Sequence, residues 1–311
     1  MKRAALWLLP AVPAACVAAA THGDGGDSWL FVGAGRTLLS HDWSRAFASP
    51  AIQVGPLQLA LDGTIGRSTT ALAVVVAVAV TLLVQAAARA AGVVSARALV
   101  GVGLAAVGVG LTANAFEAGH PADTLLPLLW IVAAADARRG RTVRAAALVG
   151  LGAGLETWSV LGLAVLALAP ERRAALRGVA LGGSLAAALF APFVLAGHFA
   201  MGAYLWDVSD RSLLALVVDP GTHVGWSLRF AQGFVAFAAG IGAAYAARRT
   251  RHAVWLVPLA VIAARLALDP LASDYYFSGF VGPALVGLVS FGSATLTRCE
   301  SSLLPSSSPA R

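Results

Sequence analysis

Apolar residues along this chain occur in long blocks that are separated by short polar segments. The blocks are rich in Ala, Leu, Val and Gly and run well beyond the length of a strand, which is typical of helices that pack closely in lipid. A helix rises about 1.5 Å per residue, so about 20 residues cross a hydrocarbon layer of ~30 Å. The pattern therefore predicts an all-α fold, a polytopic bundle of transmembrane helices with outward-facing loops.

Eight blocks are predicted to cross the membrane fully. They cover residues 4–20, 69–88, 98–113, 123–137, 180–196, 226–246, 253–268 and 280–296. The first block follows Lys2 and Arg3 and ends in small residues, so a cleaved signal peptide is one interpretation. Because further spans follow, a retained first span is favoured. Residues 1–297 then form one transmembrane domain, and the Ser- and Pro-rich residues 298–311 are expected to be a disordered cytoplasmic tail.

Residues 145–169 form a further apolar block, which lies between two basic loops at residues 138–144 and 171–177. A single crossing would place the second basic loop outside and invert every later loop. Two short half-helices that meet near Glu156 keep both loops inside. We therefore expect a re-entrant hairpin whose tip faces a cavity, because irregular backbone at membrane depth needs protein or water around it.

Charged residues make up 12% of the chain, and the mean hydropathy is +0.79. A soluble domain carries about 25% charged residues, so this composition excludes a water-soluble fold. The net charge of +7 comes mostly from arginine clusters between apolar blocks, at residues 138–144 and 248–251. Such clusters hold loops on the cytoplasmic side and do not indicate a nucleic-acid partner. They place both termini in the cytoplasm of a plasma-membrane protein, with residues 21–67 and 198–224 as long external segments.

The two cysteines, Cys16 and Cys299, lie near opposite ends of the chain, so a disulfide between them is not expected. Cys and His show no metal-ligand spacing. The sequence therefore predicts neither a metal nor a cofactor.

Candidate chemistry lies mainly in the external loops. Asp24 and Asp27 follow the first span closely, where a carboxylate can act as a base on a hydroxyl at the membrane surface. The plainer interpretation, that both are solvated loop residues among glycines, is favoured by composition alone. His120 either orients a phosphate or sits in the headgroup layer, and Asp123 is expected to cap the helix that follows.

Four further residues lie near or within the apolar blocks. A carboxylate at membrane depth costs roughly 2.5–3.5 kcal/mol, so Glu156 is expected to have a partner or a task. The alternative is that the hairpin tip reaches interfacial water. Arg265 is expected to snorkel outward, and Tyr275 and Tyr276 fit an outer aromatic belt.

Several short motifs follow one another along the chain. They are Asp27 with Phe31, Gly35-Arg36 and Leu38-Leu39, then Gln53–Leu57, Gly119–Asp123, Arg138–Arg141, Gly150–Trp158, Leu268–Pro270 and Asp274–Tyr276. In this order they resemble the polyprenol-phosphate-mannose-dependent glycosyltransferases of the GT-C superfamily, in particular the α-mannosyltransferase-like membrane proteins of actinobacteria. The resemblance covers about residues 20–296, and the ordered set carries it rather than any single motif.

The resemblance implies an inverting transfer of a sugar, with mannose favoured, from a polyprenyl phosphate to a hydroxyl of an extracytoplasmic glycolipid or glycan. Asp27 would take the proton from the acceptor, with Asp24 in reserve. Arg36 and His120, with Arg45 as a further candidate, would stabilise the phosphate leaving group without a metal. The other substrate-binding candidates are Gln53, Glu156, Trp158, Tyr275 and Tyr276.

The chain also departs from the family. Glu156 and Thr157 precede Trp158 where relatives often have a basic or amide residue, and 311 residues is short for the superfamily. Two other functions stay open, a transporter or flippase for a lipid or small solute and a catalytically inactive membrane protein of the same fold. Transporters commonly contain internal repeats, and none is evident in this sequence.

Overall fold

The structure is a computed structural model that describes residues 6–21, 23, 26–117 and 119–303. Helices dominate this part of the chain, which contains one short antiparallel pair of strands, β1 (Trp206–Asp207) and β2 (His223–Val224). The α-helices are α2 (Ala11–Thr21), α3 (Ser28–Leu38), α4 (Pro56–Ile65), α5 (Thr69–Ala90), α6 (Ala96–Gly108), α7 (Leu111–Glu117), α8 (Ala122–Arg138), α9 (Thr142–Gly152), α10 (Arg172–Leu195), α11 (Trp226–Ala247), α12 (Ala253–Ala267) and α13 (Ser278–Leu303). The 3₁₀ helices are η1 (Trp43–Arg45), η2 (Thr157–Leu168), η3 (Met201–Ala203), η4 (Leu213–Leu216) and η5 (Asp274–Phe277).

Four segments of the described chain are long and apolar enough to cross a membrane. They are α5, α10, α11 and residues Tyr275–Gly292. The mainly helical fold with apolar, span-length helices is therefore confirmed. The number of spans, eight with a re-entrant hairpin, stays a prediction.

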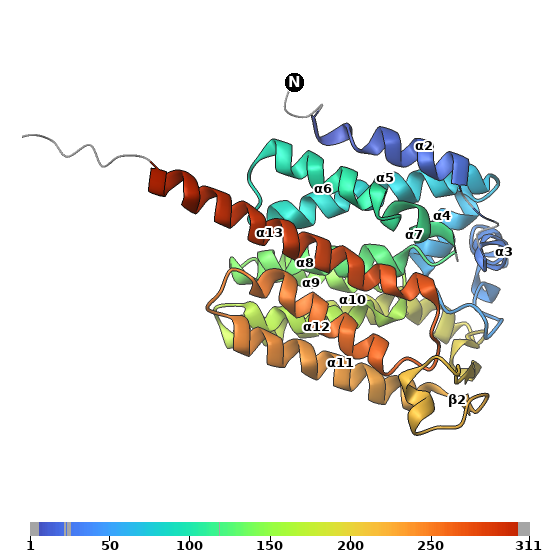
Figure 1. Ribbon diagram of the computed structural model, residues 1–311. Coiled ribbons are helices and arrows are strands. Elements are labelled where there is room, and N and C mark those ends of the chain that lie inside the picture. The colour runs from blue at the N-terminus through green and yellow to red at the C-terminus, as the bar shows by residue number, and fades with distance from the viewer. Residues whose placement is uncertain (1–5, 22, 24–25, 118, 304–311) are drawn as a thin grey trace, which may run out of the picture.

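The helices run side by side between two ends of the bundle (Figure 1). One end carries α3, α4 and the strand pair, and the opposite end carries the turns that follow α8 and α11 (Figure 1). The arginine clusters at residues 138–144 and 248–251 lie at these turns. Apolar side chains of α5, α8, η2 and α12 form the core, in which Trp130 is completely buried.

The block predicted as a third span is divided in two. α6 ends at Gly108 and α7 begins at Leu111. Gly110 lies between them with a φ of +74°, a left-handed conformation that commonly ends a helix and that glycine adopts at little cost. The apolar pattern continues through this turn, which is why hydropathy alone did not reveal it.

The segment predicted as a hairpin consists of two short helices, α9 and η2, that run antiparallel. Ser159 Oγ donates a hydrogen bond to Val149 O at 3.0 Å, close to the turn. Further from the turn, a Cβ on Gly182 of α10 would meet both Ala146 O of α9 and Leu163 of η2. Residues near the end of α9 therefore lie beside the start of η2, and earlier residues of α9 lie beside later residues of η2, so the chain reverses near Glu156.

Residues 21–67 are not an open loop, because they contain α3 and α4, which cross at two glycines. A Cβ on Gly35 would lie 2.1 Å from Leu59 O and 2.6 Å from Gly63 N. The two backbones therefore touch without intervening side chains. Asp27 is the residue immediately before α3, so this crossing fixes the position of its carboxylate.

Two other boundaries differ from those predicted. α10 begins at Arg172, before the apolar block at 180–196, and α13 continues to Leu303, into the segment expected to be a tail. Hydropathy marks only the apolar part of a helix, whereas polar residues extend it into water. Residues 198–224, which the sequence predicts to be external, contain only η3, η4 and the strand pair as regular elements.

Replacing Gly35 by Ala is expected to destabilise the protein by about 1–3 kcal/mol, because the added methyl group must push α4 away from α3. The measurement is the melting temperature in nanodiscs. Gly33→Ala is the matched control, since a Cβ at Gly33 meets nothing within 4 Å, and it should leave the melting temperature unchanged or raise it. Equal melting temperatures for the two variants would contradict the close crossing.

Candidate functional site

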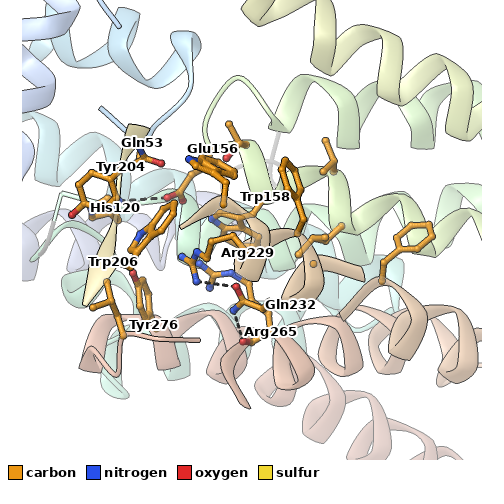
Figure 2. Close-up of a pocket in the computed structure, with 18 of the residues that line it drawn as sticks. Gln53, His120, Glu156, Trp158, Tyr204, Trp206, Arg229, Gln232, Arg265 and Tyr276 are labelled. Carbon is orange, nitrogen blue, oxygen red and sulfur yellow. Dashed lines mark hydrogen bonds and ion pairs between the residues drawn. The ribbon is translucent and has the colours of Figure 1, made fainter. Parts of the chain in front are cut away.

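A cavity of about 600 Å³ opens at the end of the bundle that carries α3 and α4 (Figure 2). Charged and polar side chains gather on one part of its wall, and apolar side chains of η2 and α11 form another part. The polar part includes Asp27, Gln53, His120, Glu156, Arg229, Gln232 and Arg265, and the aromatic part includes Trp158, Tyr204, Trp206, Trp226, Phe230, Phe234, Phe237, Tyr275 and Tyr276.

Backbone hydrogen bonds hold Glu156 at the edge of this cavity. Gly55 N donates to Leu155 O at 2.7 Å, and Val54 pairs with Glu156 in an isolated bridge. A Cβ on Gly55 would lie 2.3 Å from Gly154 O, so only glycine allows the two strands of backbone to approach this closely. The start of α4 therefore fixes the turn between α9 and η2.

The loop before α8 places His120 beside Glu156. Gln58 Nε2 of α4 donates to Gly119 O at 3.0 Å, and Gly119 has a φ of +78°. The imidazole then stacks on Tyr275, with centroids 5.5 Å apart, and meets the ring of Phe31 edge-on at 5.1 Å. The rings of Tyr275 and Phe31 thus fix the orientation of this imidazole.

His120 lies between two carboxylates. Its Nε2 is 3.3 Å from Asp27 Oδ2, and its Nδ1 is 3.6 Å from Glu156 Oε1. Burial lowers the pKa of His120, but the contacts with Asp27 and Glu156 outweigh this effect and raise it to about 10. The hydrogen bond from His120 in turn lowers the pKa of Asp27, whose side chain is 64% exposed. Asp27 is therefore ionised and open to the cavity at neutral pH.

Asp123 does not cap its helix as the sequence suggested. Pro121 occupies the cap position, and Asp123 points inward from the first turn, 98% buried, with no hydrogen bond to either side-chain oxygen among the described residues. Arg265 Nη1 lies 3.5 Å from Asp123 Oδ1. An inward carboxylate at this depth needs positive charge nearby, and α12 supplies it.

The prediction that Arg265 snorkels outward is also wrong. Its side chain is buried and lies over the ring of Trp158, 4.3 Å from the centroid, and over Tyr276 at 5.2 Å. Nη2 is 3.8 Å from Asp269 Oδ2, one helical turn further along. Two carboxylates and two aromatic faces therefore hold the guanidinium inside the bundle.

Arg229 is a cavity residue that the sequence gave no reason to select, because it follows the start of an apolar block closely. Nη1 lies 3.0 Å from Asp269 Oδ1 and donates to Gln232 Oε1 at 2.8 Å, and the guanidinium covers the ring of Trp206 at 4.7 Å. Gln232 Nε2 completes the network by donating to Asp269 Oδ2 at 3.2 Å. An arginine this near the end of a predicted span is expected to lie at the membrane surface. Only the structure shows that Arg229 pairs with Asp269 beside the cavity.

Most of the residues selected from the sequence do meet at this cavity. Those that line it are Asp27, Gln53, His120, Glu156, Trp158, Tyr275 and Tyr276. Arg36 and Arg45 are exposed and do not line it, and Asp24 lies outside the described residues. Arg229 and Arg265, instead of Arg36 and Arg45, are the arginines that line the cavity.

The arrangement combines a carboxylate open to the cavity, buried positive charge and an extended apolar wall, which together suit a substrate with a phosphate, a hydroxyl-bearing part and a hydrocarbon chain. His120, Asp123 and Glu156 could also hold a metal ion, since one ligand atom from each lies within 4.8 Å of the others. Among protein families, curated proteins and solved structures, none matches this chain.

Replacing Asp269 by Asn is expected to destabilise the protein by about 3–5 kcal/mol, because Arg229 and Arg265 would lose a buried charged partner. The measurement is the melting temperature in nanodiscs. Asp210→Asn removes an exposed carboxylate whose hydrogen bond is to the neighbouring Ser209, and should leave the melting temperature within about 1 °C of wild type. If Asp269→Asn melts like Asp210→Asn, the network does not stabilise the bundle.

Proposed function

We propose that this protein is a multi-pass plasma-membrane glycosyltransferase that moves a sugar, with mannose favoured, from a polyprenyl-phosphate donor to an extracytoplasmic acceptor hydroxyl. The observation that carries the proposal is the cavity itself, which is lined by an ionised, exposed carboxylate, two arginines and an apolar wall. The order of motifs along the chain, which resembles that of the polyprenol-phosphate-mannose-dependent enzymes, supports the same reaction.

The distribution of arginines supports an external location for the cavity. The arginine clusters at residues 138–144 and 248–251 lie at the end of the bundle opposite α3 and α4 (Figure 1). Basic loops stay in the cytoplasm, so the cavity would open to the outside, where polyprenyl-linked sugars would meet external acceptors. Both termini would then be cytoplasmic.

Asp27 is the proposed general base. Its carboxylate is accessible, and the hydrogen bond from His120 holds it in one orientation. The acceptor hydroxyl would give its proton to Asp27 while its oxygen forms a bond to C1 of the sugar. The bond from C1 to the phosphate oxygen breaks at the same time, and its electron pair leaves with the polyprenyl phosphate. One displacement of this kind inverts the anomeric centre.

Arg229 is the proposed partner of the donor phosphate. Its guanidinium lines the cavity and is held by Asp269 and Gln232 rather than being free to move. Arginine forms paired hydrogen bonds with phosphate oxygens, and positive charge close to a leaving phosphate stabilises the charge that develops there. Arg265 lies deeper in the wall and is paired with Asp123 and Asp269.

The apolar wall is the proposed path for the prenyl chain. Leu161 of η2 and Phe237 of α11 line the cavity, and Phe230 and Phe234 of α11 continue it onto the outer face of the helix, where they are 70% and 73% exposed. α11 is one of the segments able to cross a membrane, so these two phenylalanines would face lipid. A donor in the bilayer could therefore enter the cavity sideways.

Replacing Asp27 by Asn is expected to lower sugar transfer by about 10²–10⁴-fold, because the amide cannot accept the acceptor's proton. Transfer is measured in membranes that contain labelled polyprenyl-phosphate mannose, together with the expression level and melting temperature, which should not change. Asp42→Asn is the matched control, since Asp42 is exposed and does not line the cavity. Undiminished transfer in Asp27→Asn would remove Asp27 as the base.

A further inference from the structure

Three ligand-type side chains from distant parts of the chain converge beside the cavity. His120 lies in the loop before α8, Asp123 lies in the first turn of α8, and Glu156 lies in the turn between α9 and η2. One ligand atom of each lies within 4.8 Å of the other two. Asp123 and Glu156 are both more than nine-tenths buried.

Several side-chain atoms of these three residues lack hydrogen-bond partners among the described residues. They are His120 Nδ1, both carboxylate oxygens of Asp123 and Glu156 Oε2. Buried polar atoms normally have partners, and leaving a charged one unpaired is expensive. Asp123 Oδ1 forms an ion pair with Arg265, and His120 Nδ1 lies near Glu156. Asp123 Oδ2 and Glu156 Oε2, however, have no hydrogen bond within the described residues, which points to a partner other than a side chain of this protein.

The spacing fits atoms that share a metal ion. His120 Nδ1 and Glu156 Oε1 are 3.6 Å apart, which is too long for a hydrogen bond. Two ligands that each bind a tetrahedral ion at about 2.1 Å lie roughly 3.4 Å apart. The distance is therefore close to that between two ligands of one ion.

The surroundings of His120 also match those of a metal ligand. A ligating imidazole usually donates its second N–H to a carboxylate, which fixes the tautomer and leaves the other nitrogen free to bind. Asp27 Oδ2 is placed to accept that hydrogen from Nε2 at 3.3 Å. Nδ1, on the other side of the ring, points toward Glu156, and a metal ion that displaces its proton would bind there.

The charge around the site leaves room for a divalent cation. The carboxylates of Asp123 and Asp269 contact the guanidinium groups of Arg229 and Arg265, and those of Asp27 and Glu156 contact His120. With His120 protonated, four negative groups meet three positive ones. A divalent ion bound at Nδ1 would displace the proton there, and the charges of the site would then balance, which matters because unbalanced charge in an apolar bundle is costly.

We propose that His120, Asp123 and Glu156 bind one divalent transition-metal ion at the edge of the cavity, with Mn²⁺ and Zn²⁺ as the best candidates. One imidazole with two carboxylates suits these ions, whereas Ca²⁺ takes six to eight oxygen ligands. Positions of the ion that the protein leaves open would face the cavity. That the ion there contacts a donor phosphate rests on the proposed function, whereas its binding does not.

The test uses the full-length chain in phosphatidylcholine nanodiscs, stripped with EDTA and titrated with MnCl₂ alone. Electron paramagnetic resonance is expected to show one Mn²⁺ bound per chain, and ZnCl₂ should displace it. Pulsed measurements should show coupling of the ion to one imidazole nitrogen. Absence of saturable binding, or binding without nitrogen coupling, would overturn the proposal even if every variant failed to fold.

Variants separate the ligands from their neighbours. His120→Gln should abolish the nitrogen coupling, and His120→Gln and Glu156→Gln should each weaken binding more than 100-fold. Asp27→Asn, which changes only the partner of the imidazole, should weaken it by about 10–100-fold. His223→Gln is the matched control, because His223 is exposed and pairs with Asp207 on the strand pair, and it should bind Mn²⁺ like wild type. Unchanged binding in His120→Gln would contradict the site.

Sugar transfer, measured separately with saturating MnCl₂, distinguishes the two proposals. Mn²⁺ binding with nitrogen coupling but no transfer would support the ion site and contradict the glycosyltransferase. Asp27-dependent transfer that persists after EDTA treatment, in a chain that binds no Mn²⁺, would support the glycosyltransferase and contradict the ion site.

Discussion

Charge inside an apolar bundle has to be neutralised by other charge, and this constraint shapes the cavity end of the protein. Arg265 could not lie among helices of this composition without Asp123 and Asp269 beside it, and those carboxylates could not lie there without Arg229 and Arg265. The network therefore joins the start of α8 to α11 and the end of α12. The ion pairs beside the cavity therefore also hold these three helices together.

Close backbone contact, rather than charge, places the remaining groups. The glycines at 35 and 63 bring α3 against α4, and the start of α4 in turn holds the backbone at Gly154 and Gly119. These three contacts determine the positions of Asp27, His120 and Glu156. Segments from the first third of the chain and from its middle thus reach one site without a long connecting helix.

The helical class and the positions of α5, α8, α11 and α12 could be predicted, because each follows from the length of an apolar block. The break at Gly110 could not, since it lies within continuous apolar sequence. Neither could the helices within residues 21–67, whose mixed composition hides two short amphipathic segments.

The candidate site was predictable in part for a similar reason. Residues such as His120 and Glu156 are conspicuous because polar groups are rare near apolar blocks, and they do meet at the cavity. Which side chains pair with one another depends on the three-dimensional fold and is not visible in the sequence. Asp123 and Arg265 are 142 positions apart, so their pairing is not visible in the sequence. For this reason the sequence predicts a helix cap at Asp123 and an outward-pointing side chain at Arg265, whereas the structure has a buried ion pair.

The 3₁₀ geometry of η2 determines how far this segment extends along the bundle. A 3₁₀ helix rises about 2.0 Å per residue, compared with about 1.5 Å in an α-helix. The 12 residues of η2 therefore extend about 24 Å, a length for which an α-helix would need about 16 residues. The winding is also narrower, and Gly162 fits directly against the indole of Trp130. A segment of 12 residues thus reaches as far along the bundle as a longer α-helix would, and several of its side chains line the cavity.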